Sequence, residues 1–296
     1  MSFLAHYQEL LGPFEAYLQR AFPTLAPQVS VLEESVRYSL LAGGKRLRPV
    51  LMLSLLEAAG QPLEPALPFG AAIEFIHSYS LIHDDLPCMD DDDLRRGKPT
   101  NHKVYGEDIA LLAGDALLTE AFRLLSAPER LAHYPAEAVL AACYCLSTKA
   151  GNFGMVAGQV ADIRAEQGQG DAALLEYIHH HKTGQLITAS LEIGAILAGL
   201  EAQRTAAVVR FGNALGRCFQ IQDDILDETG DAANLGKPIG SDQKNQKLTY
   251  PSLFGLEQAQ KLAEEAYQEA LGHLEDTGLP AGGLRQLSDF VLKRDR

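Results

Sequence analysis

The sequence predicts an all-α fold. Apolar residues recur at the helical period of 3.6 along almost every long segment, whereas the two-residue alternation of a half-buried strand is scarce. Several segments are apolar around most of their circumference, which indicates a central layer of helices wrapped by outer ones. Glycine and alanine recur in the middle segments, where small side chains allow neighbouring helices to approach closely. No linker rich in proline or serine divides the chain, so we expect a single domain over residues 1–296.

The helix boundaries follow from local start and stop signals. Residues 31–42 form an amphipathic stretch that Gly43 and Gly44 end, and Pro49 suits the first turn of the next helix, over 49–60. A third helix, over 66–86, ends before a proline that cannot continue it. Apolar periodicity predicts the remaining helices over 107–126, 135–164, 171–199, 202–228, 251–275 and 283–293. The polar segment 230–247 fits either a lid over a site or a solvated surface connection.

Composition excludes several classes of function. The chain has 39 acidic and 25 basic residues and a net charge of −14, which argues against a nucleic-acid-binding surface. The N-terminus has neither the basic nor the apolar region of a signal peptide, and no apolar run reaches the roughly 18 residues of a membrane span. The four cysteines show no CxxC spacing, which argues against a zinc site and a disulfide framework and favours a cytoplasmic location.

Two aspartate-rich clusters carry the chemistry. Six of the ten residues from Asp84 to Asp93 are carboxylates, and the helix over 202–228 contains a second group at Asp223, Asp224 and Asp227. Two like charges about 4 Å apart repel by roughly 4 kcal/mol at an effective dielectric constant near 20, so such clusters are costly unless cations fill them. Oxygen ligands suit Mg2+, which completes its shell with water and phosphate oxygens. Gln220, Asp223 and Asp227 share one helix face, and two such faces could hold metal ions between them.

Basic residues accompany both clusters. The candidate phosphate-binding cations are Lys45, Arg48, Arg95, Arg96, Lys182 and Lys237. The turn over residues 43–48 has exposed amides and three cations, but it lacks the glycine spacing and the Ser/Thr of a Walker A loop. Arginine binds phosphate through paired hydrogen bonds, whereas lysine acts as a point charge. Each cation alone is typical of a solvated surface, but together with the carboxylate clusters they indicate diphosphate chemistry.

Other site signatures fail. Residues 179–181 are consecutive histidines, whose side chains point about 100° apart on a helix and cannot converge on one ion. Counted from Asp90, an EF-hand loop would require glycine at Arg95 and glutamate at Asn101. No nucleophile arrangement stands out, and Cys88 is expected to pack rather than react. Three polar residues within apolar segments fit either a supporting role at the site or satisfied core groups: Asp115, Gln159 and Asp162.

The ordered motifs resemble the trans-isoprenyl diphosphate synthase family. The matching stretches are Gly43–Pro49, His77–Asp85, Asp90–Arg96, His181–Gly184, Phe219–Asp227 and Lys247–Pro251. The resemblance implies an isoprenoid-synthase-type helical bundle with a deep central cavity, and a homodimer as the assembly. It also implies Mg2+-dependent head-to-tail condensation of isopentenyl diphosphate with dimethylallyl or geranyl diphosphate. The implied product is (2E,6E)-farnesyl diphosphate, released with diphosphate.

The resemblance also implies residue roles. It assigns the binding of three Mg2+ ions to Asp84, Asp90, Asp223 and Asp227. It assigns the allylic diphosphate to Arg95, Lys182 and Lys237, and isopentenyl diphosphate to Lys45, Arg48, His77 and Arg96. The catalytic assignments are Lys182, Thr183, Gln220 and Lys237. The Thr183 hydroxyl and the Gln220 carbonyl would stabilise an allylic carbocation, and the departing diphosphate would accept the proton.

Product length depends on the residues before the first cluster. Tyr79 lies five residues before Asp84, so about 7 Å deeper along the helix, where a bulky side chain could close the cavity at a C15 product. Four residues separate the Asp84 pair from Asp90, and in this family that insertion accompanies short products. A geranylgeranyl (C20) diphosphate synthase is the alternative. A terpene cyclase, a metal phosphohydrolase using His83 and Asp84, and a non-enzymatic cation-binding module explain fewer of the motifs.

Overall fold

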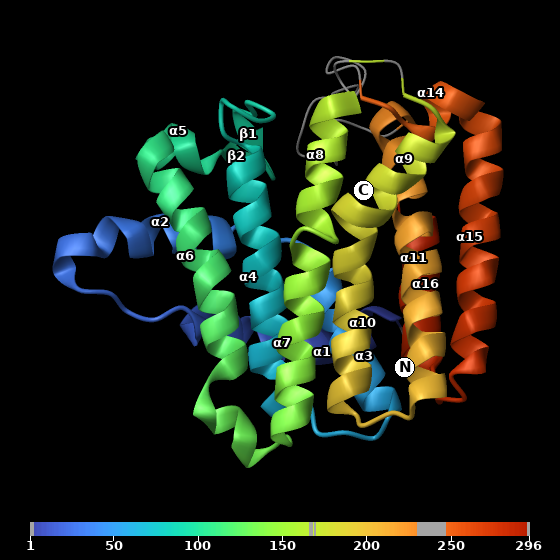
Figure 1. Cartoon of the computed structure of the whole chain (residues 1–296), viewed down its shortest axis with the longest axis horizontal. Helices are drawn as coiled ribbons and strands as arrows, with labels where there is room; N and C mark the ends of the chain where they lie inside the picture. Colours follow the sequence, from blue (N-terminus) through green and yellow to red (C-terminus); the bar gives the residue numbers. More distant parts are fainter. Residues whose placement is uncertain (1–2, 166–167, 169, 230–246, 295–296) are drawn as a thin grey trace.

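The computed structural model describes residues 3–165, 168, 170–229 and 247–294. Long helices run side by side through most of this part of the chain (Figure 1). The strands within it are β1, Leu94–Arg95, and β2, Lys98–Pro99, which pair as a short antiparallel hairpin. The prediction of an all-α fold is confirmed. None of the helices in the described ranges is both long enough and apolar enough to cross a membrane.

The elements follow one another with short connections. The first half contains α1 Phe3–Ala21, η1 Pro27–Val29, α2 Ser30–Leu40, α3 Leu47–Ala58, η2 Glu64–Ala66, α4 Leu67–Asp84, α5 Asn101–Tyr105 and α6 Glu107–Ser126. The second half contains η3 Pro128–Ala132, α7 Ala136–Ala150, α8 Met155–Ala165, α9 Ala172–Ile178, η4 His179–Gly184, α10 Gln185–Leu197, α11 Ala202–Thr229, α14 Tyr250–Phe254, α15 Leu256–Asp276 and α16 Gly282–Lys293. Of these, η4 is a single π-helical segment and the other η elements are 3-10 turns.

Three segments were predicted as single helices, and this prediction is wrong because each of them is interrupted. The segment over 135–164 turns between Gly151 and Gly154 and forms α7 and α8. The segment over 171–199 contains η4 between α9 and α10, and the segment over 251–275 breaks at Gly255, whose φ of 79° is left-handed. The helix α1 was not predicted, because Pro13 lies inside it, although its buried residues recur at helical spacing.

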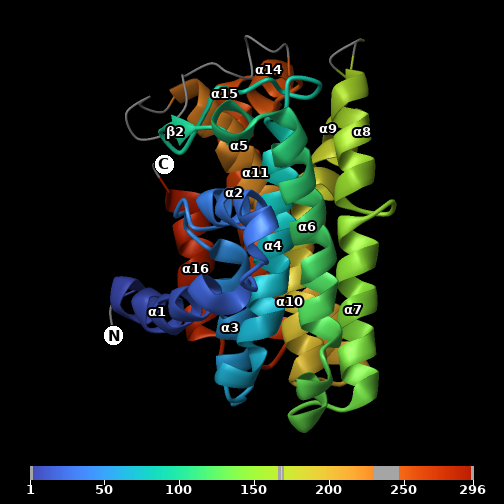
Figure 2. The ribbon, with the colours of Figure 1, turned by 90° about the vertical axis from the view of Figure 1, so that its left-hand side faces the viewer.

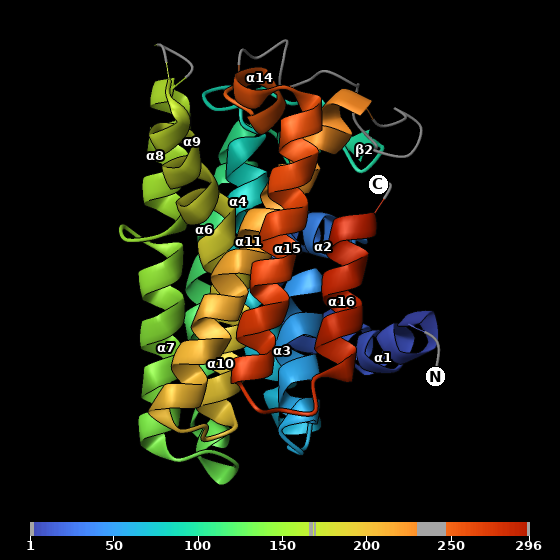
Figure 3. The same cartoon turned by 90° about the vertical axis from the view of Figure 1, so that its right-hand side faces the viewer.

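The core is built around α3, α4 and α10. These helices are buried around most of their circumference, as the sequence predicted for a central layer. The helix α10 packs against α3, α7 and α11, whereas α6 covers α4 on one side of the molecule (Figure 2). On the other side, α15 and α16 cover α11 (Figure 3). Of the three core helices, α4 reaches the site described below, where the C-terminal part of α11 also lies.

Glycines bring η4 into contact with the helices on either side of it. A Cβ atom on Gly158 of α8 would lie 2.1 Å from the Lys182 backbone nitrogen. A Cβ atom on Gly216 of α11 would lie 2.9 Å from the Gly184 Cα. Real Cβ contacts are not this short, so only glycine allows these backbones to approach so closely. The predicted role of small residues in close helix packing is confirmed here, at the segment that carries Lys182 and Thr183.

Candidate active site

A cavity lies between α4, α8, η4 and α11. Its volume is about 380 Å³. Most of the site residues predicted from the sequence line it, namely His77, Asp84, Asp90, Arg95, Arg96, Lys182, Thr183, Gln220 and Asp223. The lining also includes residues without a predicted role: Asp92, Asp162, His179, Asp224 and Lys247. Both aspartate clusters and cations from three separate segments therefore face one space.

Four predicted site residues do not line this cavity as described. Lys45 is outside the lining, and its ammonium lies 5.8 Å from the centre of the Phe290 ring. Arg48 and Asp227 are outside the lining, and Asp227 is buried one turn beyond Asp223 on α11. Lys237 and nearly all of the segment predicted as a lid or a surface connection, residues 230–246, lie outside the described residues.

The first aspartate cluster folds back on the end of α4. Asp84 is the last residue of α4, and the Asp90 backbone nitrogen donates a 2.8 Å hydrogen bond to the Asp84 carbonyl oxygen. The loop thereby returns Asp90 to the helix end. Burial raises the pKa of Asp84 to about 6, with Lys182 opposing the shift and Asp90 adding to it. Holding the Asp84 carboxylate ionised in this position is costly unless a cation joins it.

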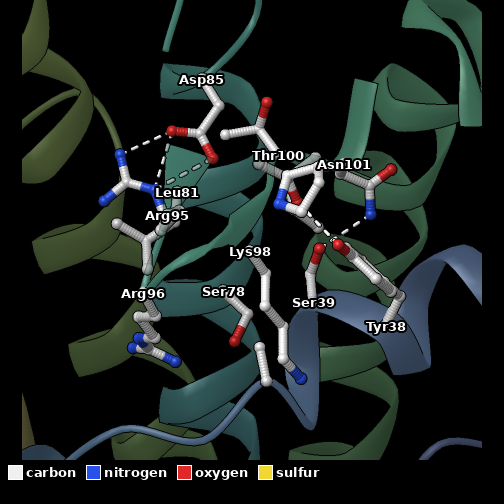
Figure 4. Close-up of a pocket in the computed structure, with 13 residues that line it drawn as sticks. Tyr38, Ser39, Ser78, Leu81, Asp85, Arg95, Arg96, Lys98, Thr100 and Asn101 are labelled. Carbon is white, nitrogen blue, oxygen red and sulfur yellow. Dashed lines mark hydrogen bonds and ion pairs between the residues drawn. The ribbon is translucent and has the colours of Figure 1, made fainter. Parts of the chain in front are cut away.

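The neighbouring Asp85 has a different function from Asp84. It is buried, and its carboxylate accepts hydrogen bonds of 2.7 and 3.0 Å from the Arg95 Nε, with an Arg95 Nη2 contact of 2.6 Å (Figure 4). Such a bidentate pair fixes the plane of the guanidinium. Sequence reasoning missed this role, for which the only signal was an acidic residue next to the predicted metal ligand and an arginine ten positions later.

Asp162 joins two lysines at the opposite wall. Its Oδ2 lies 2.5 Å from the Lys182 Nζ and 3.8 Å from the Lys247 Nζ, and Lys247 is also 3.4 Å from Asp90. Burial alone would raise the pKa of Asp162, but Lys182 and Lys247 outweigh it and lower that pKa. This settles one of the three polar residues left open by the sequence. Asp115 is exposed, and the Gln159 amide nitrogen is buried without a hydrogen-bond partner among the described residues.

The second cluster divides its carboxylates between two tasks. Asp223 is partly exposed, and its Oδ1 lies 3.0 Å from Arg294 Nη2, whose guanidinium stacks 3.9 Å above the Phe219 ring centre. Asp224 instead accepts a 2.9 Å hydrogen bond from the Tyr250 backbone nitrogen and a 3.2 Å bond from Gln220. Asp224 therefore fastens the segment that carries Lys247 to α11. This anchor was not predicted, because it depends on a contact 26 residues away along the chain.

The turn over residues 43–48 contains one structural arginine. Arg46, one of the three cations of this turn, is buried and pairs with Glu74 at 2.7 Å and with Glu15 at 2.8 Å. The Arg48 Nε is buried without a hydrogen-bond partner among the described residues. Burial lowers the pKa of Arg48 to about 10, and the nearby Arg96 adds to this shift. An arginine with an unused buried donor beside a second arginine fits an anionic ligand.

Arg96 reaches this turn from the hairpin. Its guanidinium donates to the Gly43 carbonyl oxygen and lies so close to Gly44 that a Cβ atom there would be 2.7 Å from the Arg96 Cζ. His77 faces the same corner, and burial together with Arg48 lowers its pKa well below the usual value, so its imidazole is neutral. The cavity therefore has a cationic corner at the hairpin, separate from the lysines beside Asp162.

The carboxylates fit a hard divalent cation. Among the residues that the structure describes, no three acidic, histidine or cysteine side chains gather closely enough to hold an ion by themselves. Asp84 and Asp90 on one wall and Asp223 on the other offer only oxygen donors. Mg2+ usually binds through one or two carboxylates and keeps water or phosphate oxygens as its other ligands. The donor set therefore fits Mg2+ together with a phosphorylated ligand.

The sequence profile of polyprenyl synthetases matches residues 29–278. The chain belongs to the polyprenyl synthetase family. It is 47% identical over 266 residues to the farnesyl diphosphate synthase of Geobacillus stearothermophilus, a match that covers 89% of each chain. It is 43% identical over 287 residues to the geranylgeranyl diphosphate synthase of Cyanophora paradoxa, covering 95% of this chain and 93% of the relative.

A solved member of the polyprenyl synthetase family has the same fold. The geranyltransferase of Helicobacter pylori, complexed with magnesium and isoprenyl diphosphate, superimposes with a TM-score of 0.86 at 33% identity, covering 99% of this chain and 97% of that one. The family and the fold implied by the sequence motifs are thus confirmed. This polyprenyl synthetase is a prenyltransferase that elongates prenyl diphosphates.

Proposed function

We propose that this polyprenyl synthetase is a Mg2+-dependent farnesyl diphosphate synthase, a single catalytic domain that joins isopentenyl diphosphate head to tail to dimethylallyl or geranyl diphosphate. One observation carries the proposal. Asp84 of α4 and Asp223 of α11 face the same cavity, together with arginines and lysines from separate segments. Carboxylates that attract metal ions, beside cations that attract phosphate, suit two diphosphates and a reaction between them.

The two ends of the cavity suit different substrates. We assign the Mg2+ ions and the allylic diphosphate to the carboxylate end, where Asp84, Asp90, Asp223 and Asp227 would hold the ions and Arg95, Lys182 and Lys237 the phosphates. We assign isopentenyl diphosphate to the cationic corner at His77 and Arg96, together with Arg48 and Lys45, which lie outside the cavity lining. The buried and unused Arg48 Nε supports this second assignment. The neutral His77 can donate a hydrogen bond without adding a charge.

The reaction would then proceed by ionisation, condensation and elimination. Bound Mg2+ supplies charge neutralisation, which makes diphosphate a better leaving group. Lys182 and Arg95 hold the departing diphosphate, while the Thr183 hydroxyl and the Gln220 carbonyl direct partial negative charge toward the allylic cation that remains. The cationic corner would bind the diphosphate of isopentenyl diphosphate and thereby place its double bond against that cation. The bond between the two prenyl units forms, and the proton lost from the new chain passes to diphosphate.

Tyr79 supports a C15 product over a C20 product. Its side chain is buried on α4, five residues before Asp84, with the His83 ring 5.7 Å away in an edge-to-face arrangement. Tyr79 is not among the residues that line the cavity, and we propose that its phenol closes the space beyond it. We predict that Tyr79→Ala will shift the main product toward C20 or longer, because removal of the phenol opens that space. Chain-length analysis of the products by mass spectrometry tests this. An unchanged C15 product would place the barrier elsewhere.

Asp84 predicts a pH-dependent affinity for metal. Its pKa of about 6 lies above the ordinary value of 3.8, so between pH 4 and 6 the carboxyl group stays protonated in the folded protein. A metal ion must displace that proton, so we expect Mg2+ affinity to rise about tenfold between pH 5 and pH 7. Titration calorimetry of Mg2+ without substrate measures this, since no phosphate group then titrates. An affinity that is constant over this range would contradict the assignment of Asp84.

An exposed apolar face supports the proposed homodimer. Exposed apolar side chains gather on the outer surfaces of α6, α7 and α8 and on the turn between α7 and α8, namely Leu111, Leu112, Leu140, Tyr144, Phe153, Val156 and Val160. The most exposed are Leu140 at 71%, Tyr144 at 72% and Phe153 at 77%. The turn that holds Phe153 projects from this side (Figures 2 and 3). Large exposed apolar patches mark association surfaces. We predict that Tyr144→Glu will reduce the mass measured by light scattering from that of a dimer to that of a monomer. A dimer that persists would mean that the interface lies elsewhere.

Unpaired cysteines at all four positions support a cytoplasmic location.

The decisive test is product analysis. Purified protein is incubated with isopentenyl diphosphate and either dimethylallyl or geranyl diphosphate, with and without Mg2+. Mg2+-dependent farnesyl diphosphate supports the proposal in full. A C20 product would keep the chemistry and replace the product assignment. Release of free phosphate, or a cyclic hydrocarbon without elongation, would overturn the proposed reaction.

A further inference from the structure

A buried amide joins the hairpin that carries Arg95 and Arg96 to α2. Asn101 is the first residue of α5, directly after the hairpin, and it is almost fully buried. Its Nδ2 donates hydrogen bonds of 2.9 Å to the Ser35 carbonyl oxygen and 2.8 Å to the Ser39 Oγ, and its Oδ1 accepts a 2.8 Å bond from the Ser35 Oγ. Figure 4 shows this amide pointing at α2 while Arg95 points at Asp85.

We propose that Asn101 is a positioning residue for isopentenyl diphosphate, acting through the hairpin on Arg96. The inference rests on the proposed function, in which Arg96 binds that substrate. Asn101 itself does not line the main cavity, so it acts only through the backbone that precedes it.

The turn of the hairpin needs an external support. Arg96 has a φ of 53° and Gly97 a φ of 73°, so both central residues are left-handed. A two-residue turn of this kind favours Asn or Gly at its first position, and arginine is strained there. Strained conformations persist only where surrounding contacts hold them. The strain is accepted here at the residue whose guanidinium reaches Gly43 and Gly44.

The two stems of the hairpin are joined at its base. The Thr100 nitrogen donates a 3.0 Å hydrogen bond to the Asp93 carbonyl oxygen, and the Thr100 Oγ1 donates a 2.7 Å bond to the Asp92 carbonyl oxygen. A further 2.7 Å bond runs from the Tyr38 hydroxyl to the Pro99 carbonyl oxygen. The bonds of Thr100 keep the hairpin closed, but they do not place it against the bundle. The three bonds of Asn101 do so together with the Tyr38 bond, since Tyr38 also lies on α2, and loss of the three Asn101 bonds leaves one bond to hold the base of a closed hairpin.

The inference is tested by kinetics on single and double variants. We expect Asn101→Ala to raise the KM for isopentenyl diphosphate about tenfold with a smaller change in kcat, since misplacement of a binding group by an ångström is costly. We expect Ser39→Ala, which removes one of the three bonds and touches no substrate, to raise the same KM by less. In an Arg96→Ala background, Asn101→Ala should add little further increase, because both changes act on one guanidinium.

A matched control separates positioning from stability. Asn213→Ala removes a 2.9 Å hydrogen bond between Thr188 of α10 and Asn213 of α11, away from the main cavity. It should lower the melting temperature without changing the KM. If Asn101→Ala lowers only the melting temperature, or raises the KM equally in the Arg96→Ala background, the positioning role is wrong. If Arg96→Ala leaves the KM unchanged, or the wild type elongates nothing, the proposed function fails instead. In that case, calorimetry with inorganic diphosphate and Mg2+ shows whether Asn101→Ala still weakens binding.

Discussion

Replacement of Asp84 or Asp223 by alanine will reduce turnover by several orders of magnitude and leave the protein folded. Each carboxylate faces the cavity from a different helix, so each change removes a proposed metal ligand from one wall. The loss of charge neutralisation at the leaving group is expected to cost on the order of 10³-fold or more. The measurement is kcat at saturating Mg2+ for each single variant and for the double variant.

The same changes are expected to spare stability. The folded-state pKa of Asp84, about 6, is raised above the unfolded value, so its ionised form at pH 7 opposes folding and alanine removes that cost. Asp223 is partly exposed at the surface of the cavity, where its pair with Arg294 contributes little. Asp115→Ala on the exposed face of α6 serves as the control and should change neither property. A folded double variant with near wild-type turnover would contradict a mechanism in which both aspartate clusters bind metal ions.

Gly158→Ala is expected to have the largest effect on the fold. The added Cβ would lie 2.1 Å from the Lys182 backbone nitrogen, and a backbone atom cannot swing aside as a side chain does. The contact between α8 and η4 must open, so we expect a loss of unfolding free energy of about 2 to 4 kcal/mol. Lys182 and Thr183 would move with η4, and turnover should fall at least tenfold. Chemical denaturation and steady-state kinetics measure the two effects.

A second glycine in a helix provides the matched control for this change. Gly272 lies within α15, and a Cβ atom there would meet nothing within 4 Å. Gly272→Ala should be neutral or stabilising by up to about 1 kcal/mol, because alanine favours helix over glycine. Equal behaviour of the two variants would mean that α8 and η4 tolerate separation, and would remove the steric argument.

The sequence predicted the helices well because their signal is local. Periodic apolar residues and the Gly43–Gly44 stop placed α2, α3, α4 and α6 within a few residues of their observed bounds. The breaks at Gly151–Gly154 and Gly255 were missed because apolar periodicity runs on across them. Asp84 and Asp223, which line the cavity, were predicted as site residues for the same reason, since both lie in motifs that a single sequence displays.

The supporting residues could not be found this way, since their roles depend on contacts between distant segments. Arg46 and Arg48 lie in one turn, yet Arg46 forms ion pairs with Glu15 and Glu74, whereas the Arg48 Nε has no hydrogen-bond partner among the described residues. Asp162 pairs with Lys182 and Lys247, which are 20 and 85 positions away along the chain. No rule of spacing connects such residues. They become neighbours only when the bundle assembles.

The pairing of Asp162 with two lysines has a consequence for how a ligand enters. The ammonium groups of Lys182 and Lys247 have internal counter-ions in Asp162 and Asp90. Under the proposed function, binding of a metal diphosphate would therefore be an ion exchange within the protein: the lysines would transfer from carboxylate to phosphate while the metal ions take over the released carboxylates. Magnesium or diphosphate alone would complete only half of this exchange and leave charges of one sign uncompensated. The site thereby favours the complex of both over either component.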